Sequence, residues 1–178
     1  MNDFLNFGQY ISTDFNENSK VWIYQCNRLL TITEVLNIEP YLNEFVATWK
    51  SHGAPVKGFA NILFGQFMVF MADESMNAVG GCSTDTSVRL VKQIEQEFAV
   101  DFFNRQNLGF IIKDKIQVIP LQQFNYAFEN GFITKETYFF NNVVTSKKEL
   151  LKNWIIPVEK SWLSTKYKLT QQTFSSLN

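Results

Sequence analysis

The sequence predicts an α+β fold with a mixed or antiparallel sheet. Runs rich in β-branched and aromatic residues alternate with segments in which apolar residues recur at helical spacing, and two pairs of runs are joined by short turns. The first part has the βαββαβ order of ferredoxin-like folds, and a helix–strand–helix extension follows it towards the C-terminus. We therefore expect one sheet-based core with helices packed against it.

The first strand and helix are predicted over residues 21–53. Val21 to Cys26 is β-branched and aromatic, which is typical of a strand. Thr31 and Thr33 offer N-caps, with Glu34 placed for a capping box. Pro40 suits the first turn of a helix that starts near Glu39, but we favour the earlier start, with Pro40 inside the helix. Apolar residues then recur at helical spacing as far as Gly53: Leu42, Phe45, Val46 and Trp49.

Two strands and a second helix follow. The runs 59–64 and 66–72 are separated by Gly65, and the second run is apolar on both faces, as a central strand is. Residues 73–77 read as a turn. Beyond it, one helical face gathers Val88, Val91, Ile94 and Phe98, which predicts an amphipathic helix.

The C-terminal third is predicted to hold a hairpin, a helix, a strand and a last helix. The hairpin strands are 108–112 and 116–119. Pro120 opens a helix that Gly131 closes, and residues 137–140 form the next strand. Ser146 and Glu149 form a capping-box pattern for the last helix, which Pro157 ends, and whose lysines we expect on its exposed side: Lys147, Lys148 and Lys152.

Length and composition indicate a single domain. The chain has 178 residues, of which 46% are apolar and 16% aromatic, enough for a sizeable core. We expect a flexible N-terminal arm over residues 1–19, docked through Phe4, Phe7 or Tyr10, one globular domain over 20–169, and a flexible tail over 170–178.

Charge and cysteine content restrict the partners and the compartment. The net charge of −1 and pI near 5.9 provide no general positive field, so nucleic acid is not an expected partner. The N-terminus lacks the basic and apolar regions of a signal peptide, and no run is long enough to span a bilayer, so we expect a cytoplasmic protein without membrane insertion. Cys26 and Cys82 are expected to be free thiols. With a single histidine and no zinc-binding spacing, no metal or cofactor is predicted.

The stretch from Gly80 to Asp85 is the strongest candidate site. A glycine turn that leads into a helix would place Cys82 near the positive helix end, where a thiolate is favoured. His52 would then serve as the base, oriented by Asp73 or Glu74, which gives a thiol-dependent enzyme. The same turn also offers a binding surface made of Gly80, Gly81, Ser83, Thr84 and Asp85.

A purely structural interpretation of these residues stays open. Ser83, Thr84 or Asp85 would cap the helix, and Cys82 would be a small buried apolar residue. His52 would lie in the last turn of the first helix, beside Gly53. A P-loop ATPase is excluded, because no glycine-rich loop is followed by Lys and Ser or Thr.

Residues 57–64 suggest a further possibility. The segment Lys57-Gly58-Phe59-Ala60-Asn61-Ile62-Leu63-Phe64 fits most of the aromatic signature of RNA-recognition motifs, although Asn61 occupies an aromatic position. Single-stranded RNA binding is therefore an alternative function.

Four motifs together resemble a family of small uncharacterised bacterial proteins that are often labelled ABC transporter ATPase. They are Ser51-His52-Gly53, Met71-Ala72-Asp73-Glu74-Ser75, Gly81-Cys82-Ser83-Thr84-Asp85 with Ser87, and Val100-Asp101-Phe102-Phe103-Asn104-Arg105. The likeness covers about residues 20–163 and includes Trp154-Ile155-Ile156-Pro157. Because the Walker motif that the label requires is absent, the resemblance implies a shared fold and carries over no catalytic residues.

A second, local pattern resembles the helix–turn–strand of GYF-type domains, which bind proline-rich peptides through aromatic residues. It comprises Leu121, Phe124, Ala127, Gly131, Ile133, Thr137 and Phe139, with Trp154 further on, although the Gly-Tyr-Phe triplet is absent. Taken together, the sequence favours a non-catalytic binding or protein-interaction domain whose partner is an unknown protein or small molecule.

Overall fold

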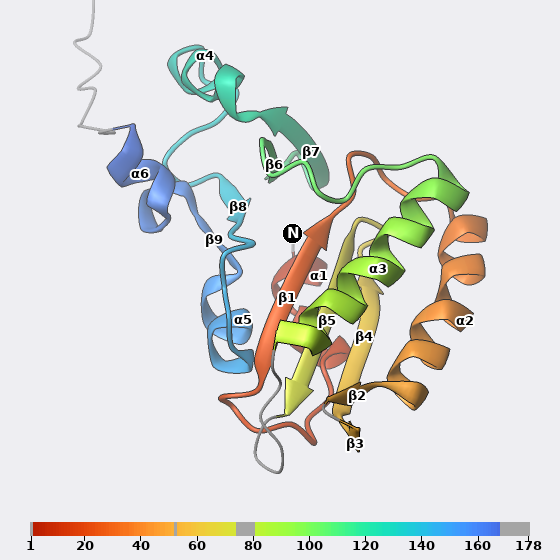
Figure 1. The fold of residues 1–178 in the computed structure, drawn as a ribbon. Helices are drawn as coiled ribbons and strands as arrows, with labels where there is room; N and C mark the ends of the chain where they lie inside the picture. The colour runs from red at the N-terminus through yellow and green to blue at the C-terminus, as the bar shows by residue number, and fades with distance from the viewer. Residues whose placement is uncertain (1, 52, 74–80, 168–178) are drawn as a thin grey trace, which may run out of the picture.

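The computed structural model describes residues 2–51, 53–73 and 81–167, apart from the side chains of Asn2 and of residues 81–84 (Figure 1). Its strands form antiparallel sheets, with helices packed around them. The predicted α+β class is therefore confirmed.

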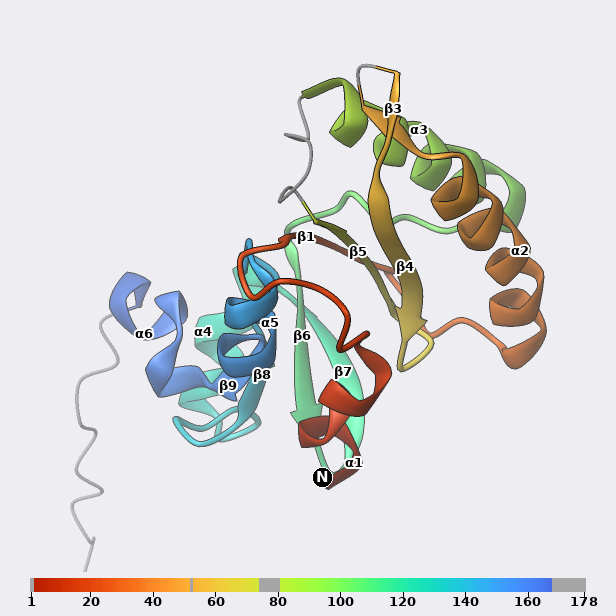
Figure 2. The same ribbon diagram turned by 90° about the horizontal axis from the view of Figure 1, so that it is seen from below.

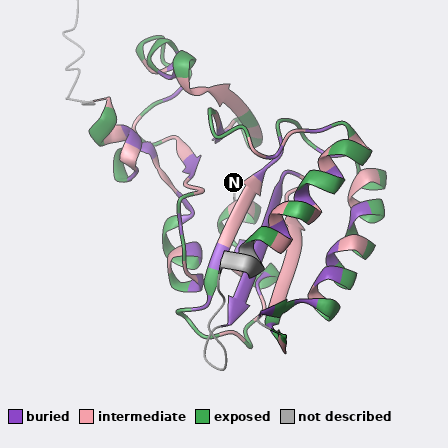
Figure 3. Ribbon diagram, in the orientation of Figure 1, coloured by how far each residue is buried: buried purple, intermediate pink, exposed green. Residues whose placement is uncertain are grey.

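The first sheet has the strand order β1 (Lys20–Gln25), β5 (Phe67–Asp73), β4 (Lys57–Leu63) and is antiparallel throughout. All seven residues of β5 are buried, as Figure 3 shows along the length of this strand. The prediction of a central strand that is apolar on both faces is confirmed. The turn from β4 to β5 has two residues with positive φ, Phe64 and Gly65.

One face of this sheet is covered by α2 (Ile32–Thr48) and α3 (Gly81–Phe98) (Figures 1 and 2). Fully buried residues between the helices and the strands include Ile38, Met68, Phe70, Val91 and Ile94. Helix α2 begins as predicted, because Thr31 and Glu34 form a capping box, and Pro40 lies within it.

The predicted end of α2 is wrong. The helix ends at Thr48, and Trp49 takes an extended conformation with its ring 4.7 Å from that of Phe45. The chain then forms a short hairpin from β2 (Lys50–Ser51) and β3 (Ala54–Pro55), with Gly53 at a φ of 85°. Burial of the Trp49 ring thus ends the helix before the glycine that the sequence offers as a C-cap. His52 lies outside the described residues.

The second sheet has the order β7 (Lys115–Pro120), β6 (Asn107–Ile112), β8 (Tyr138–Phe140), β9 (Ile155–Pro157). The predicted β6–β7 hairpin is observed, with positive φ at Lys113 and Asp114 in its turn. The ferredoxin-like order is not confirmed, because β6 pairs with β7 and β8 in this second sheet, whereas that order requires a fourth strand in the first sheet.

An aromatic core joins the two sheets. Phe67 of β5 stacks on Phe140 of β8 at 4.3 Å between ring centroids, and the Trp154 ring packs against both. Helix α5 (Lys147–Asn153) and the N-terminal α1 (Asn2–Leu5) and η1 (Phe7–Tyr10) border this core. A polar link also crosses it, since Asn142 donates to Gln25 Oε1 and accepts from Trp154 Nε1, each at 2.9 Å.

The N-terminal segment docks through two of its three expected aromatic residues. Phe7 is buried and meets Trp154 edge-on at 4.9 Å, and Phe4 packs against Phe64 at 5.0 Å, whereas Tyr10 is exposed. The division of the chain into arm, domain and tail stays a prediction. The predicted tail, residues 170–178, lies outside the described residues.

The outer face of the second sheet carries η2 (Leu121–Gln123), α4 (Phe124–Glu129), η3 (Val158–Lys160) and α6 (Trp162–Lys166). Helix α4 ends before Gly131 as predicted, whereas β9 and α6 lay outside the predictions.

In α5 the expectation for Lys147 is wrong: its side chain is buried, and Nζ donates to the carbonyl oxygens of Thr13 and Phe15. Lys148 and Lys152 are exposed.

Gly58 in β4 is required by the Trp49 ring. A Cβ on Gly58 would lie 2.9 Å from Cζ3 of Trp49 and closer still to Cε3, whereas a Cβ on Gly8 would meet its nearest atom at an ordinary 3.5 Å. We expect Gly58→Ala to lower the free energy of unfolding by about 1–3 kcal/mol, because the buried ring has to move. Urea denaturation measures this effect, with Gly8→Ala as the control. Equal stability of the two variants would contradict the packing described.

Candidate functional site

A cleft lies between helix α2 and strand β4. It has a volume of about 220 Å³, and its walls come from α2 and from consecutive residues of β4: Val35, Glu39, Leu42, Asn43, Ala60, Asn61 and Ile62. Alternate side chains of a strand point to opposite faces. Ala60 and Ile62 belong to the face that packs against α2, so Asn61 reaches the cleft only at the edge of the strand. The cleft is therefore open along the outer edge of β4.

The backbone at this edge has no strand partner. Within the described ranges β4 pairs with β5 alone, and β5 is the middle strand of its sheet. The N–H of Ile62 donates to Oδ1 of the adjacent Asn61 at 2.8 Å, which indicates an outward-facing donor. Since outward donors recur at every second residue, those of Gly58 and Ala60 face the same way.

The opposite edge of the first sheet is partly covered. The N–H of Val21 in β1 donates to the carbonyl of Thr145 at 2.9 Å, and Lys20 forms an isolated bridge with Ser146. An exposed strand edge is a template for pairing with another extended chain. In the first sheet, the edge of β4 is thus the one better suited to that role.

The helical wall of the cleft is acidic and polar. Glu39 and Asn43 are exposed, and no hydrogen bond or ion pair involves either side chain in the part of the chain that the structure describes. Helix α2 contains Glu34, Glu39 and Glu44 but no Lys or Arg. The floor of the cleft is apolar, formed by Leu42, Ala60 and Ile62.

Large apolar side chains are exposed at the start of α2, close to the cleft. Ile32 is 81% exposed, Leu36 is 59% exposed, and Leu29 in the preceding loop is 61% exposed. Ile32 and Leu36 are four residues apart and lie on one side of the helix, next to Val35 of the cleft. We call these three residues the apolar rim.

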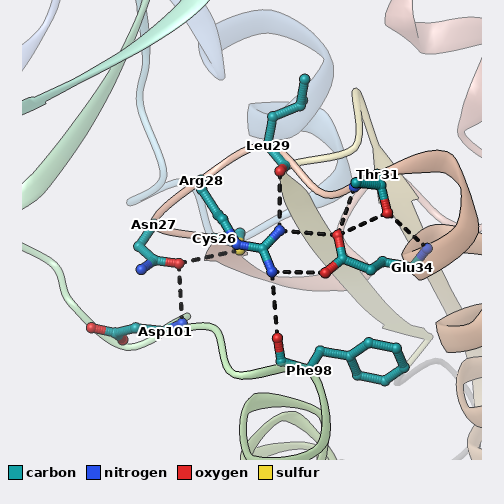
Figure 4. Close-up of polar contacts among 8 residues, drawn as sticks. All are labelled: Cys26, Asn27, Arg28, Leu29, Thr31, Glu34, Phe98 and Asp101. Carbon is teal, nitrogen blue, oxygen red and sulfur yellow. Dashed lines mark hydrogen bonds and ion pairs between the residues drawn. The ribbon is translucent and has the colours of Figure 1, made fainter.

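Polar contacts attach the loop that carries Leu29 to its surroundings (Figure 4). The two terminal nitrogens of Arg28 donate to the two carboxylate oxygens of Glu34 at 2.9 and 2.7 Å. Arg28 also reaches the carbonyl oxygen of Phe98 at 3.4 Å, close to the C-terminal end of α3, where a cation is favoured. The loop before α2 is thereby attached to both helices.

Glu34 has an unusually low pKa. Its hydrogen bonds with the Arg28 guanidinium, and then with the N–H and hydroxyl of Thr31, lower the pKa of Glu34 from 4.5 to about 2. The carboxylate is thus ionised at any physiological pH. Its negative charge pairs with Arg28 and lies in the first turn of α2, where an anion is favoured.

Cys26 directly follows β1, at the start of the loop that leads to α2. It is a buried free cysteine. Burial raises the pKa of its thiol, and Sγ lies 3.6 Å from Oδ1 of Asn27. That oxygen also accepts from the N–H of Asp101. A buried thiol with a raised pKa is a poor nucleophile.

The predicted thiol site falls largely outside the described residues. This applies to His52, Glu74 and Gly80, and to the side chains of Cys82, Ser83 and Thr84. Asp73 is described: it is buried at the end of β5, opposite Lys57 of β4, and Lys57 Nζ lies 3.8 Å from its Oδ2. The arrangement of Cys82, His52 and Asp73 therefore stays a prediction.

The residues of the predicted binding turn belong mostly to the start of α3. That helix begins at Gly81, so Ser83, Thr84 and Asp85 follow its first residue, and none of them is its N-cap. Asp85 is exposed. A binding role for Gly80, Gly81, Ser83, Thr84 and Asp85 stays a prediction.

Two structural findings bear on the general class of the protein. Over the described ranges, no three His, Cys, Asp or Glu residues gather in a way that could hold a metal ion. No helix in those ranges combines the length and the apolar character needed to cross a membrane.

No family model, curated protein or solved structure matches this chain. The resemblance to the family labelled ABC transporter ATPase and the resemblance to GYF-type domains thus both stay predictions.

Sequence reasoning did not find the cleft. Val35, Glu39, Leu42 and Asn43 show the helical spacing of a single face, which was a usable signal. However, the order of strands in a sheet decides which strand is at the edge, and this order is not visible in any local pattern.

The low pKa of Glu34 makes a pH-dependent contribution to stability. Because the folded-state pKa lies below the unfolded value, the contribution is fully present above about pH 4.5 and is lost as the pH falls towards 2. We expect Glu34→Gln to lower the free energy of unfolding by about 0.5–1 kcal/mol at pH 7, and the difference from wild type to disappear near pH 2. Urea titrations at several pH values measure it.

The matched control for this prediction is Glu39→Gln on the same helix, whose carboxylate has no partner in the described structure. This control should change the free energy of unfolding at pH 7 less than Glu34→Gln does. An equal effect of the two substitutions would contradict the role assigned to the Arg28–Glu34 pair.

Proposed function

We propose that the protein is a cytoplasmic, non-catalytic binding module that takes up an extended segment of a partner protein along the outer edge of β4. The observation that carries this proposal is the coincidence of an unpaired strand edge with a side-chain-sized cleft. In such strand addition the edge hydrogen-bonds the peptide backbone, and pockets beside it accept alternate side chains.

The size of the cleft supports a peptide rather than a small metabolite. Small-molecule sites usually enclose about 300–1,000 Å³, and this cleft has about 220 Å³. It suits a single side chain. The rest of the binding energy would then come from the strand edge and the apolar rim.

The alternative of RNA binding through residues 57–64 has less support. Single-stranded RNA stacks on aromatic rings exposed on an open sheet face. The Phe59 ring packs edge-on against Phe15 at 6.3 Å, and the Lys57 ammonium group lies 3.1 Å from a carboxylate oxygen of Asp14. The carboxylates of α2 would also repel a polyanion.

Strand addition can be tested with peptides selected from a random twelve-residue library on the full chain. N-methylation of a bound peptide at alternate residues removes the backbone donors that face β4. We expect one set of alternate positions to weaken binding by at least about 10-fold, and the other set, which faces solvent, to change it little. Isothermal titration calorimetry measures both affinities, and the solvent-facing set is the matched control.

A variant of the protein provides the complementary test. Ala60→Pro removes an outward-facing donor, and proline is tolerated on edge strands. Binding should be lost while the circular dichroism spectrum is kept. Peptides that bind this variant normally and tolerate N-methylation in either set would exclude strand addition.

A further inference from the structure

The charge distribution around the cleft points to the chemical class of the bound segment. Glu34, Glu39 and Glu44 are the only charged residues of α2, and the carboxylate of Glu34 is neutralised by Arg28. Glu39 is the carboxylate that lines the cleft. Within the described residues it has no cationic partner.

The lining of the cleft matches a long basic side chain. Leu42, Ala60 and Ile62 form an apolar floor on which methylene groups can lie, and Glu39 and Asn43 supply acceptor oxygens beside it. An aspartate or glutamate in this position would meet the Glu39 carboxylate without a compensating cation.

A second contact is set by the geometry of the strand and the helix. Side chains two residues apart in a strand lie about 6.7 Å from each other on one face. Along the axis of α2, Leu36 lies about 4.5 Å and Ile32 about 10.5 Å from Glu39. A side chain about 6.7 Å from the one in the cleft therefore falls between these two exposed residues of the apolar rim.

We propose that the segment bound at β4 is basic, with an Arg or Lys side chain in the cleft and an apolar side chain two residues away on the apolar rim. This inference rests on the proposed function and names its ligand class. The apolar side chain lies towards the Ile62 end of β4, because the start of α2 is joined to that end by the Leu30 N–H to Gly65 carbonyl bond of 2.8 Å.

The same charges argue against a second copy of this chain as the occupant. Pairing of two β4 edges would bring two α2 helices together, and with them the two Glu39 carboxylates that line the clefts. Like charges brought together at an interface are unfavourable. A basic segment of another protein has the complementary charge.

The test uses one library-selected peptide in four versions, with Arg, Lys, Leu or Glu at the position that enters the cleft. Fluorescence anisotropy with the full chain should show the Arg and Lys versions binding about 10-fold more tightly than the Glu version. Glu39→Gln should weaken the Arg version about 2- to 5-fold and leave the Leu version unchanged. Glu44→Gln, on the same helix but outside the cleft, is the matched control and should have no effect on either version.

The possible results separate this inference from the proposed function. If all four versions bind equally and still depend on strand pairing, the basic ligand class is wrong and the binding mode stands. If the library yields no peptide that binds the full chain, both proposals fail. Light scattering measures whether the full chain forms a dimer. A dimer that the Ala60→Pro variant no longer forms would identify a second copy as the occupant and overturn the inference.

Discussion

The burial of β5 on both faces is the constraint on which the rest of the structure depends. Every residue of this strand is buried, so helices have to cover one face of the first sheet and an aromatic core has to cover the other. The sheet then meets solvent only at its edges. The edge of β1 is engaged by residues 145–146, whereas β4 has its outer edge beside a cleft. The candidate binding surface thus follows from the way the core is built.

Rigid support around the cleft is consistent with a binding role. Gly58 lets the Trp49 ring lie directly against β4, which fixes the end of α2 relative to the strand. At the other end of α2, the Arg28–Glu34 pair and the capping box fix the loop that carries Leu29. A groove with both ends fixed loses little conformational entropy on binding.

Local elements were predictable because their signals are local. The Thr31–Glu34 capping box, the double-sided burial of β5 and the β6–β7 hairpin each depend on residues close together in the sequence. The end of α2 was not predictable, because the buried position of Trp49 depends on Gly58 in a later strand. For the same reason the placement of β6 in a second sheet, and with it the open edge of β4, could not be read from the order of elements.

The sequence directed attention to Cys82, His52 and Asp73 as a candidate site. Of these three residues only Asp73 has a described side chain, and it lies opposite Lys57.

Amide hydrogen exchange, followed residue by residue with and without a selected peptide, shows whether a peptide pairs with the edge of β4. In the free protein, the amides of Gly58, Ala60 and Ile62 should exchange faster than those of the alternating residues, because they lack a strand partner. They should become protected when the peptide binds. Protection that appears at residues 81–85 of α3, with the amides of β4 unchanged, would contradict this pairing.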